Sequence, residues 1–178
     1  MLYFNKIKFI VDSKTLSETQ RENLLSKIKS STEMGYMVQV LDAEELSRKM
    51  LRMYVKGNSR VLILISRNKV NLNTLSHDAA SSLIQRVIDS GVEVKEIYVD
   101  TVGTPEKYAA KLKQQFPGIE ITVSKKADSL YPIVSAASIV AKVTRDTNLK
   151  NWAPSDKIAP HINTKFGSGY PSGLYYDF

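Results

Sequence analysis

The sequence predicts an α/β fold, in which helices pack against a sheet. Two short apolar runs, at residues 94–100 and 119–123, have the length and composition of buried strands. The residues between them have the apolar spacing of a helix, so the chain forms a strand–helix–strand unit with parallel strands. A long helical pattern follows within residues 125–146 and can cover the sheet.

The size and charge of the chain suit one basic domain. With 178 residues and a hydrophobic fraction of 43%, residues 1–178 are expected to form a single domain around one core. The net charge of +7 favours a polyanionic partner such as nucleic acid. An ordinary basic, solvated surface would account for the same charge, so composition alone does not decide between the two.

The residue types in the chain limit its metal chemistry. The absence of cysteine excludes disulfides, thiolate metal sites and a cysteine nucleophile. His77 and His161 are the two histidines, which makes a histidine-rich zinc site implausible. A divalent cation would therefore need oxygen ligands, which favours Mg²⁺ or Mn²⁺.

The hydrophobic segments are too short for a membrane protein. No apolar run approaches the roughly 20 residues that a membrane span needs. The first residues, MLYFNKIKF, place lysines among the apolar side chains and lack the apolar centre of a signal peptide. An intracellular protein with no membrane association is expected.

The first part of the chain is expected to alternate strands and helices. Residues 2–11 alternate loosely and read as a strand or an extended segment. Ser17 can cap a helix over residues 17–29. Residues 36–41 (YMVQVL) read as a strand, and a short helix follows over residues 43–53.

The segment 54–66 interrupts this alternation. Within it, residues 60–66 (RVLILIS) read as a strand, which would be an aggregation-prone edge if it were exposed.

The next helix is expected over residues 71–90, where His77 reads as a packed, hydrogen-bonded histidine rather than a catalytic one. Its buried residues are expected to be Leu75, Ala79, Leu83, Val87 and Ile88.

The crossover helix and the long helix carry clear starting signals. Pro105 begins the crossover helix, with Tyr108 and Leu112 facing inward. Ser129 is expected to cap the long helix, with Pro132 in its first turn. The buried stripe of the long helix is expected to be Leu130, Ile133, Val134, Ala137, Val140 and Ala141.

Two aspartates are expected to meet at one end of the sheet. Asp100 ends the first strand of the crossover unit, and Asp128 follows the second strand, just before the long helix. Open α/β sheets bind ligands at the carboxyl ends of adjacent parallel strands. A helix-capping carboxylate is the alternative for Asp128, because the helix dipole also favours negative charge there. The presence of Asp100 favours a shared site.

Five stretches of the sequence carry a family resemblance. They are VDSKTLSE, NLNTLSHDAA, YVDTVGTPEKYAAKL, KADSLYPIVSAASIVAKVTRD and GSGYPS. In this order and spacing they resemble the catalytic subunit of eukaryotic and archaeal ribonuclease H2, over most of residues 10–54 and 67–172. The resemblance implies a ribonuclease H-like mixed sheet flanked by helices, of which this chain lacks the first strands.

The resemblance also implies roles for five residues. Asp100 and Asp128 match catalytic metal ligands of the family, which binds Mg²⁺ or Mn²⁺. Tyr170 matches a tyrosine that stacks against the ribose at the scissile junction, although an ordinary loop aromatic is the alternative. Asn71 and Lys14 match positions near the nucleic-acid backbone, and Lys14 could equally belong to a turn.

The activity that the resemblance implies is endonucleolytic. The family cuts the RNA strand of RNA/DNA hybrids and single ribonucleotides in DNA, using two metal ions. Such a protein would act in the nucleus if its source is eukaryotic. The two accessory subunits of eukaryotic ribonuclease H2 are further candidate partners.

The family pattern is incomplete in this sequence. Family members add two carboxylates from a DEAGRG motif on their first strand, whereas no Asp or Glu precedes Asp12 here. We therefore expect a chain that is truncated at both ends and catalytically incomplete on its own. Residues 54–66 are expected to be an insertion, and residues 173–178 leave the family pattern.

Two alternatives of other classes remain open. The chain could be a catalytically inactive nucleic-acid-binding protein that keeps the basic surface, or a fragment without function. A generic nucleotide-binding domain is disfavoured, because the sequence has neither a GxGxxG nor a P-loop pattern.

Overall fold

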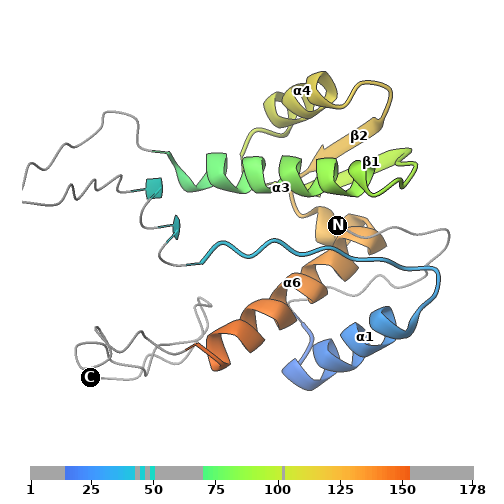
Figure 1. Cartoon of the computed structure of the whole chain (residues 1–178), viewed down its shortest axis with the longest axis vertical. Helices are drawn as coiled ribbons and strands as arrows, with labels where there is room; N and C mark the ends of the chain where they lie inside the picture. The colour runs from blue at the N-terminus through green and yellow to red at the C-terminus, as the bar shows by residue number, and fades with distance from the viewer. Residues whose placement is uncertain (1–14, 43–44, 47–48, 51–69, 102, 153–178) are drawn as a thin grey trace, which may run out of the picture.

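The computed structural model describes residues 15–42, 45–46, 49–50, 70–101 and 103–152, and its elements are shown in Figure 1. The elements are α1 (Glu18–Ser30), α3 (Leu72–Asp89), β1 (Glu96–Asp100), α4 (Pro105–Gln115), β2 (Glu120–Ser124), α5 (Ala127–Leu130) and α6 (Pro132–Lys150). The α/β class predicted from the sequence is confirmed.

The crossover unit forms as the sequence predicts. β1 and β2 pair in parallel, in a register that runs from Glu96 opposite Glu120 to Asp100 opposite Ser124. α4 connects them, with Pro105 in its first turn and Tyr108 and Leu112 buried. The carboxyl ends of the two strands therefore lie together at one edge of the sheet.

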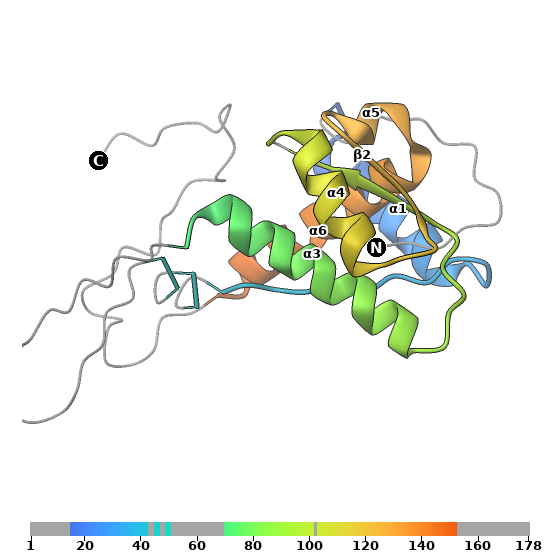
Figure 2. The same cartoon turned by 90° about the horizontal axis from the view of Figure 1, so that it is seen from above.

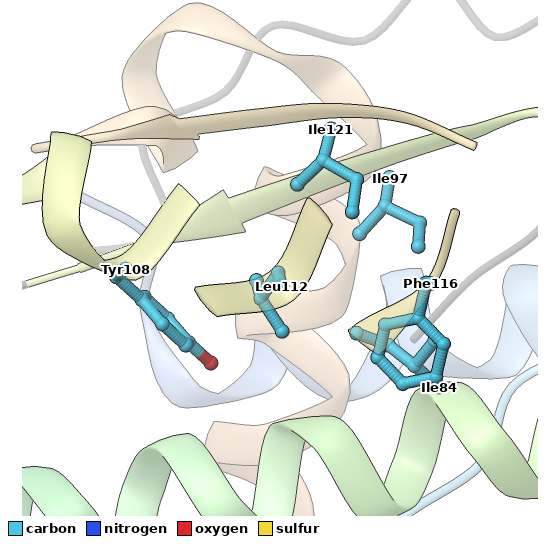
Figure 3. Close-up of a cluster of buried hydrophobic side chains, with 6 residues drawn as sticks. All are labelled: Ile84, Ile97, Tyr108, Leu112, Phe116 and Ile121. Carbon is cyan, nitrogen blue, oxygen red and sulfur yellow. The ribbon is translucent and has the colours of Figure 1, made fainter. Parts of the chain in front are cut away.

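One hydrophobic cluster joins this sheet to the helices α3 and α4, which lie beside each other in Figure 2. Figure 3 shows its six buried residues, in which the two strand isoleucines face the helices. They are Ile84, Ile97, Tyr108, Leu112, Phe116 and Ile121. This cluster fixes the position of the two strands relative to the helices, and hence the position of the carboxyl ends of the strands.

A second cluster joins α1 to α6, which lie side by side in both views. Its buried residues are Leu25, Ile28, Ile139, Val140 and Val143. At one end of the cluster, where α1 begins and α6 ends, Arg21 pairs with Asp146 at 3.8 Å and Lys150 pairs with Glu18. α6 also contacts β1 and α5, so it connects this cluster to the edge of the sheet where the strands end.

The helix starts agree with the sequence at α1 but not at α6. Ser17 caps α1 in a capping box with Gln20, as predicted. Ser129 does not cap the long helix, because it lies inside the separate one-turn helix α5. The chain becomes extended at Tyr131, and α6 then begins at Pro132 without a side-chain cap.

This break also explains an error in the predicted stripe of α6. The prediction treated Leu130 as part of one continuous helix, yet Leu130 precedes the break and is 58% exposed. Val134 and Val140 are buried as expected, Ile133 and Ala137 are half-buried, and Ala141 is exposed. On α3, Leu75 and Val87 are buried as expected, Ala79, Leu83 and Ile88 are half-buried, and Ser81 and Ile84 are buried in addition.

The strand predicted at residues 36–41 is wrong. Tyr36 makes one isolated bridge, and residues 37–42 have no strand assignment. The physical reason is that no described strand pairs along this segment: a cavity of about 430 Å³ is lined both by residues 36–39 and by β1. Among the described residues, the sheet consists of β1 and β2 alone.

Several predicted features fall outside the described residues. These are the segment 2–11, the strand at 60–66 and the tail at 173–178. The helix expected over residues 43–53 is helical where it is described, at residues 45–46 and 49–50. In the described part, no helix combines the length and the hydropathy that crossing a bilayer requires.

The two ends of the segment that contains residues 54–66 lie near each other. Lys49 and Val70 line the same cavity of about 360 Å³. Deleting residues 54–66 should therefore leave a link that still reaches between these two points. We expect the deletion variant to unfold cooperatively, with a midpoint within a few degrees of the parent protein and with less aggregation. Calorimetry and light scattering would measure this, and loss of cooperative unfolding would show that the segment is part of the core.

His77 and Tyr108 form a stacked pair between α3 and α4. Their ring centroids are 3.6 Å apart and the rings are 9° from parallel. Burial lowers the pKa of His77, as does the nearby Lys111, whereas Asp78 acts in the opposite direction. Packing against Tyr108 supports the structural interpretation of His77 over a catalytic one.

The hydroxyl of Tyr108 is buried and has no hydrogen-bond partner among the described residues. Burial raises the pKa of Tyr108 to about 12, with a smaller contribution from Asp78. Since the folded pKa exceeds the usual value of 10, the stability linked to this group is complete below pH 10 and is lost as the pH rises towards 12.

Tyr108→Phe is expected to be neutral or to stabilise the fold by up to about 1 kcal/mol at pH 7, because it removes an unsatisfied buried hydroxyl. Its advantage should grow by on the order of 2 kcal/mol between pH 10 and 12, where the parent protein alone loses the Tyr108 contribution. Urea unfolding at several pH values measures both effects. A variant that is less stable at pH 7 would mean that the hydroxyl has a partner.

Candidate functional site

The candidate site lies at the carboxyl ends of the two strands. Asp100 is the last residue of β1, opposite Ser124, the last residue of β2. Beyond the strands, the Thr101 N–H donates to the Ser124 carbonyl at 3.1 Å, which keeps the two chains together past the sheet. The chain then turns through Lys125 and Lys126 into α5, so the first residues of α5 lie over this end of the sheet.

The turn brings Asp128 to Asp100. The backbone N–H of Ala127 donates a hydrogen bond to Oδ1 of Asp100 at 3.0 Å. Asp128 is the next residue and is 4% exposed, whereas Asp100 is largely exposed. Both aspartates line the cavity of about 430 Å³ beside β1. The two carboxylates that the sequence predicts to meet thus share one cavity.

The hydrogen bond at Asp100 affects its chemistry. Oδ1 accepts from the main chain, which fixes the orientation of the carboxylate and leaves Oδ2 for another partner. A carboxylate with one oriented oxygen and one open oxygen suits a hard cation such as Mg²⁺ or Mn²⁺. The residues present therefore fit a divalent cation in the type of donor they offer.

The number of donors is smaller than a complete site requires. Among the described residues, no group of three or more His, Cys, Asp or Glu side chains could hold a metal ion. Asp100 and Asp128 would supply two oxygen ligands, and the remaining positions would fall to water, to phosphate oxygens or to other carboxylates.

A pair of tyrosines lies next to the aspartates, and one of them, Tyr98, lines the cavity. Tyr98, two residues before Asp100, packs against Tyr131 with ring centroids 4.6 Å apart. The Tyr98 hydroxyl donates to Glu96 at 2.7 Å, and this hydrogen bond raises the pKa of Tyr98. Both rings hold the segment between α5 and α6 against β1, and sequence reasoning did not single them out.

Of the other three predicted site residues, the structure describes only Asn71, which does not line this cavity. Asn71 is exposed and caps α3, because its Oδ1 accepts from the N–H of Thr74 at 2.7 Å and from the Thr74 hydroxyl at 2.9 Å. This capping role accounts for the asparagine without a ligand. Lys14 and Tyr170 lie outside the described residues.

Comparisons with known proteins agree on one family. A family model described as Ribonuclease HII matches residues 4–174. A ribonuclease H2 subunit from Arabidopsis thaliana is 51% identical over 160 residues, which cover 90% of this chain and 49% of that protein. The corresponding ribonuclease H2 subunit from Homo sapiens is 47% identical over 163 residues, which cover 92% of this chain and 50% of that protein.

Solved structures give the same result. The crystal structure of ribonuclease H2 from Pyrococcus horikoshii OT3 has a TM-score of 0.61 and 28% identity, over 90% of this chain and 63% of that chain. A structure of the PCNA:RNase HII complex from Archaeoglobus fulgidus matches with a TM-score of 0.60 and 26% identity, over 78% of this chain and 56% of that one. The chain spans about half the length of the curated relatives it matches.

Proposed function

Because the chain belongs to the ribonuclease HII family, we propose that it supplies part of the active site of an endoribonuclease. The substrate is the RNA strand of RNA/DNA hybrids, together with ribonucleotides embedded in DNA. The observation that carries the proposal is the meeting of Asp100 and Asp128 at one cavity, with Asp100 oriented by the Ala127 N–H.

In this proposal, Asp100 and Asp128 are two of the carboxylates that hold Mg²⁺ or Mn²⁺. The bound ions would activate a water molecule and neutralise the leaving oxygen of the phosphodiester. The role of Asp100 and Asp128 is to offset the positive charge of the ions and to fix their place. The hydrogen bond from Ala127 keeps Asp100 in one orientation, so it does not have to reorganise when an ion binds.

Further residues would contact the nucleic acid. Tyr170 would stack against the ribose whose 2′-hydroxyl distinguishes RNA from DNA. Asn71 and Lys14 would lie near the backbone, with Asn71 able to use its amide N–H groups while its Oδ1 caps α3. For a eukaryotic source, the same proposal includes a nuclear location and the two accessory subunits of ribonuclease H2 as partners.

The proposal can be tested by restoring the carboxylates that the sequence lacks. The 178-residue chain alone should show little or no Mg²⁺-dependent cleavage of a labelled RNA/DNA hybrid, because two carboxylates offset too little charge for two close metal ions. A chimera in which an N-terminal segment that carries the family's Asp-Glu pair is joined ahead of residue 10 should cleave the RNA strand.

Three outcomes of this experiment are informative. Cleavage by the chimera and not by the chain alone supports the proposal. Cleavage by the chain alone would contradict the incompleteness of its site. A chimera that unfolds cooperatively and binds hybrid in a salt-sensitive way, yet cleaves nothing, would favour a catalytically inactive binding protein.

A further inference from the structure

The turn between β2 and α5 has an unusual backbone conformation. Lys126 has φ 55° and ψ 37°, in the left-handed region. In the part of the chain that the structure describes, the other two residues with positive φ are glycines, Gly91 and Gly118. A residue with a Cβ atom is strained there and glycine is not, so the lysine is an exception that calls for a reason.

This conformation positions the candidate site. It reverses the chain within one residue, so that the Lys126 carbonyl accepts from the Ser129 N–H at 3.0 Å and begins α5. The next residue, Ala127, can then donate to Asp100, and Asp128 enters the same cavity. Strained residues of this kind cluster at functional sites, where the surroundings hold them in place.

Glycine would adopt this backbone conformation with less strain than lysine does. The side chain of Lys126 is exposed, and it makes no hydrogen bond or ion pair with another residue of the described part. Nothing in that part of the fold therefore uses the ammonium group. Lys125, its neighbour, is also exposed. Two lysines thus lie in the turn that connects β2 to Ala127 and Asp128.

We propose that Lys126 is a substrate-positioning residue that contacts a backbone phosphate of the nucleic acid entering at Asp100 and Asp128. This inference rests on the proposed function. Two carboxylates repel a polyanion, and an ammonium group beside them offsets that repulsion at the place where a phosphodiester must approach. The left-handed turn fixes the origin of the lysine side chain next to the pair, so the charge is delivered at the site rather than elsewhere on the basic surface.

Glycine and arginine variants separate the charge from the backbone. Lys126→Gly removes the ammonium group and keeps the left-handed conformation without strain, so its unfolding midpoint should equal or exceed that of the parent protein. Lys126→Arg keeps a positive charge at the same position. Lys113→Ala, at an exposed lysine in the last turn of α4, is the matched control for the loss of one charge.

Hybrid binding is measured by fluorescence anisotropy, without divalent cations, over a series of salt concentrations. We expect Lys126→Gly to weaken binding about threefold to tenfold and to lower the slope of log affinity against log salt by about 0.9, the value for one phosphate contact. Lys126→Arg should restore both quantities, and Lys113→Ala should change neither.

Unchanged affinity and slope in Lys126→Gly would overturn the inference while leaving the proposed function standing. A loss that Lys126→Arg does not restore would also overturn it. If the parent chain shows no salt-sensitive binding to the hybrid, both the inference and the proposed function are contradicted.

Discussion

Asp128→Asn in the chimera that carries the restored Asp-Glu pair is expected to lower the rate of hybrid cleavage about a thousandfold. Asp128 is buried at the cavity, and its carboxylate would carry one of the negative charges that hold the ions. Loss of about 4 kcal/mol of transition-state stabilisation, typical for a disturbed metal site, corresponds to that factor. Asp89→Asn, at the exposed end of α3, is the matched control and should leave the rate unchanged.

A structural role for Asp128 would give a different result. Because asparagine has the same shape and relieves repulsion from Asp100, the variant should be at least as stable as the parent protein in the absence of metal. A large fall in the unfolding midpoint together with the loss of activity would assign Asp128 to the fold. Full activity in the variant would remove Asp128 from the reaction.

Leu112→Ala is expected to lower the free energy of unfolding by about 3 kcal/mol, within the range found for buried leucines. Leu112 is fully buried between the sheet and α3, so its removal leaves a cavity in the cluster that Figure 3 shows. Leu72→Ala, at a leucine that is 56% exposed, should change stability by less than about 0.5 kcal/mol.

Urea denaturation of both variants measures this difference. The result has a consequence for the site, because the cluster sets the position of β1 and β2 and thus of Asp100. A small effect of Leu112→Ala would mean that the crossover unit is not held by this cluster. Some other part of the fold would then have to position the aspartates.

The crossover unit was predictable because its signals are local. The spacing and the composition of the apolar residues indicated both strands, and Pro105 indicated the start of α4. The handedness of crossover connections placed Asp100 at the same edge of the sheet as the end of β2. The meeting of Asp100 with the region of Asp128 follows from those rules alone. The capping box at Ser17 is equally local, and it too was found.

The errors occur where conformation depends on distant parts of the chain. Residues 36–41 have the composition of a strand, but a strand forms only beside a neighbour, and a cavity separates this segment from β1. Ser129 is a residue type that commonly caps helices, but Tyr131 is extended, so α6 begins only at Pro132.

The left-handed conformation of Lys126 could likewise not be predicted from the sequence. Lysine has no preference for it, and the turn is imposed by the pairing of β1 with β2 on one side and by α5 on the other. The sequence shows a lysine pair close to Asp128. It does not show which of the two lysines adopts the left-handed conformation.

The central claim is that Asp100 and Asp128 jointly hold a divalent cation. Adding Mn²⁺ to the isotope-labelled 178-residue chain and following the broadening of its amide signals tests it most directly. We expect the signals of Asp100, Ala127 and Asp128 to broaden at Mn²⁺ concentrations that leave Asp89 unaffected, and Asp128→Asn to shift this broadening to roughly tenfold higher concentration, as the loss of one ligand predicts. Equal broadening at Asp89 and at the Asp100–Asp128 pair, or a response unchanged in Asp128→Asn, would contradict the claim.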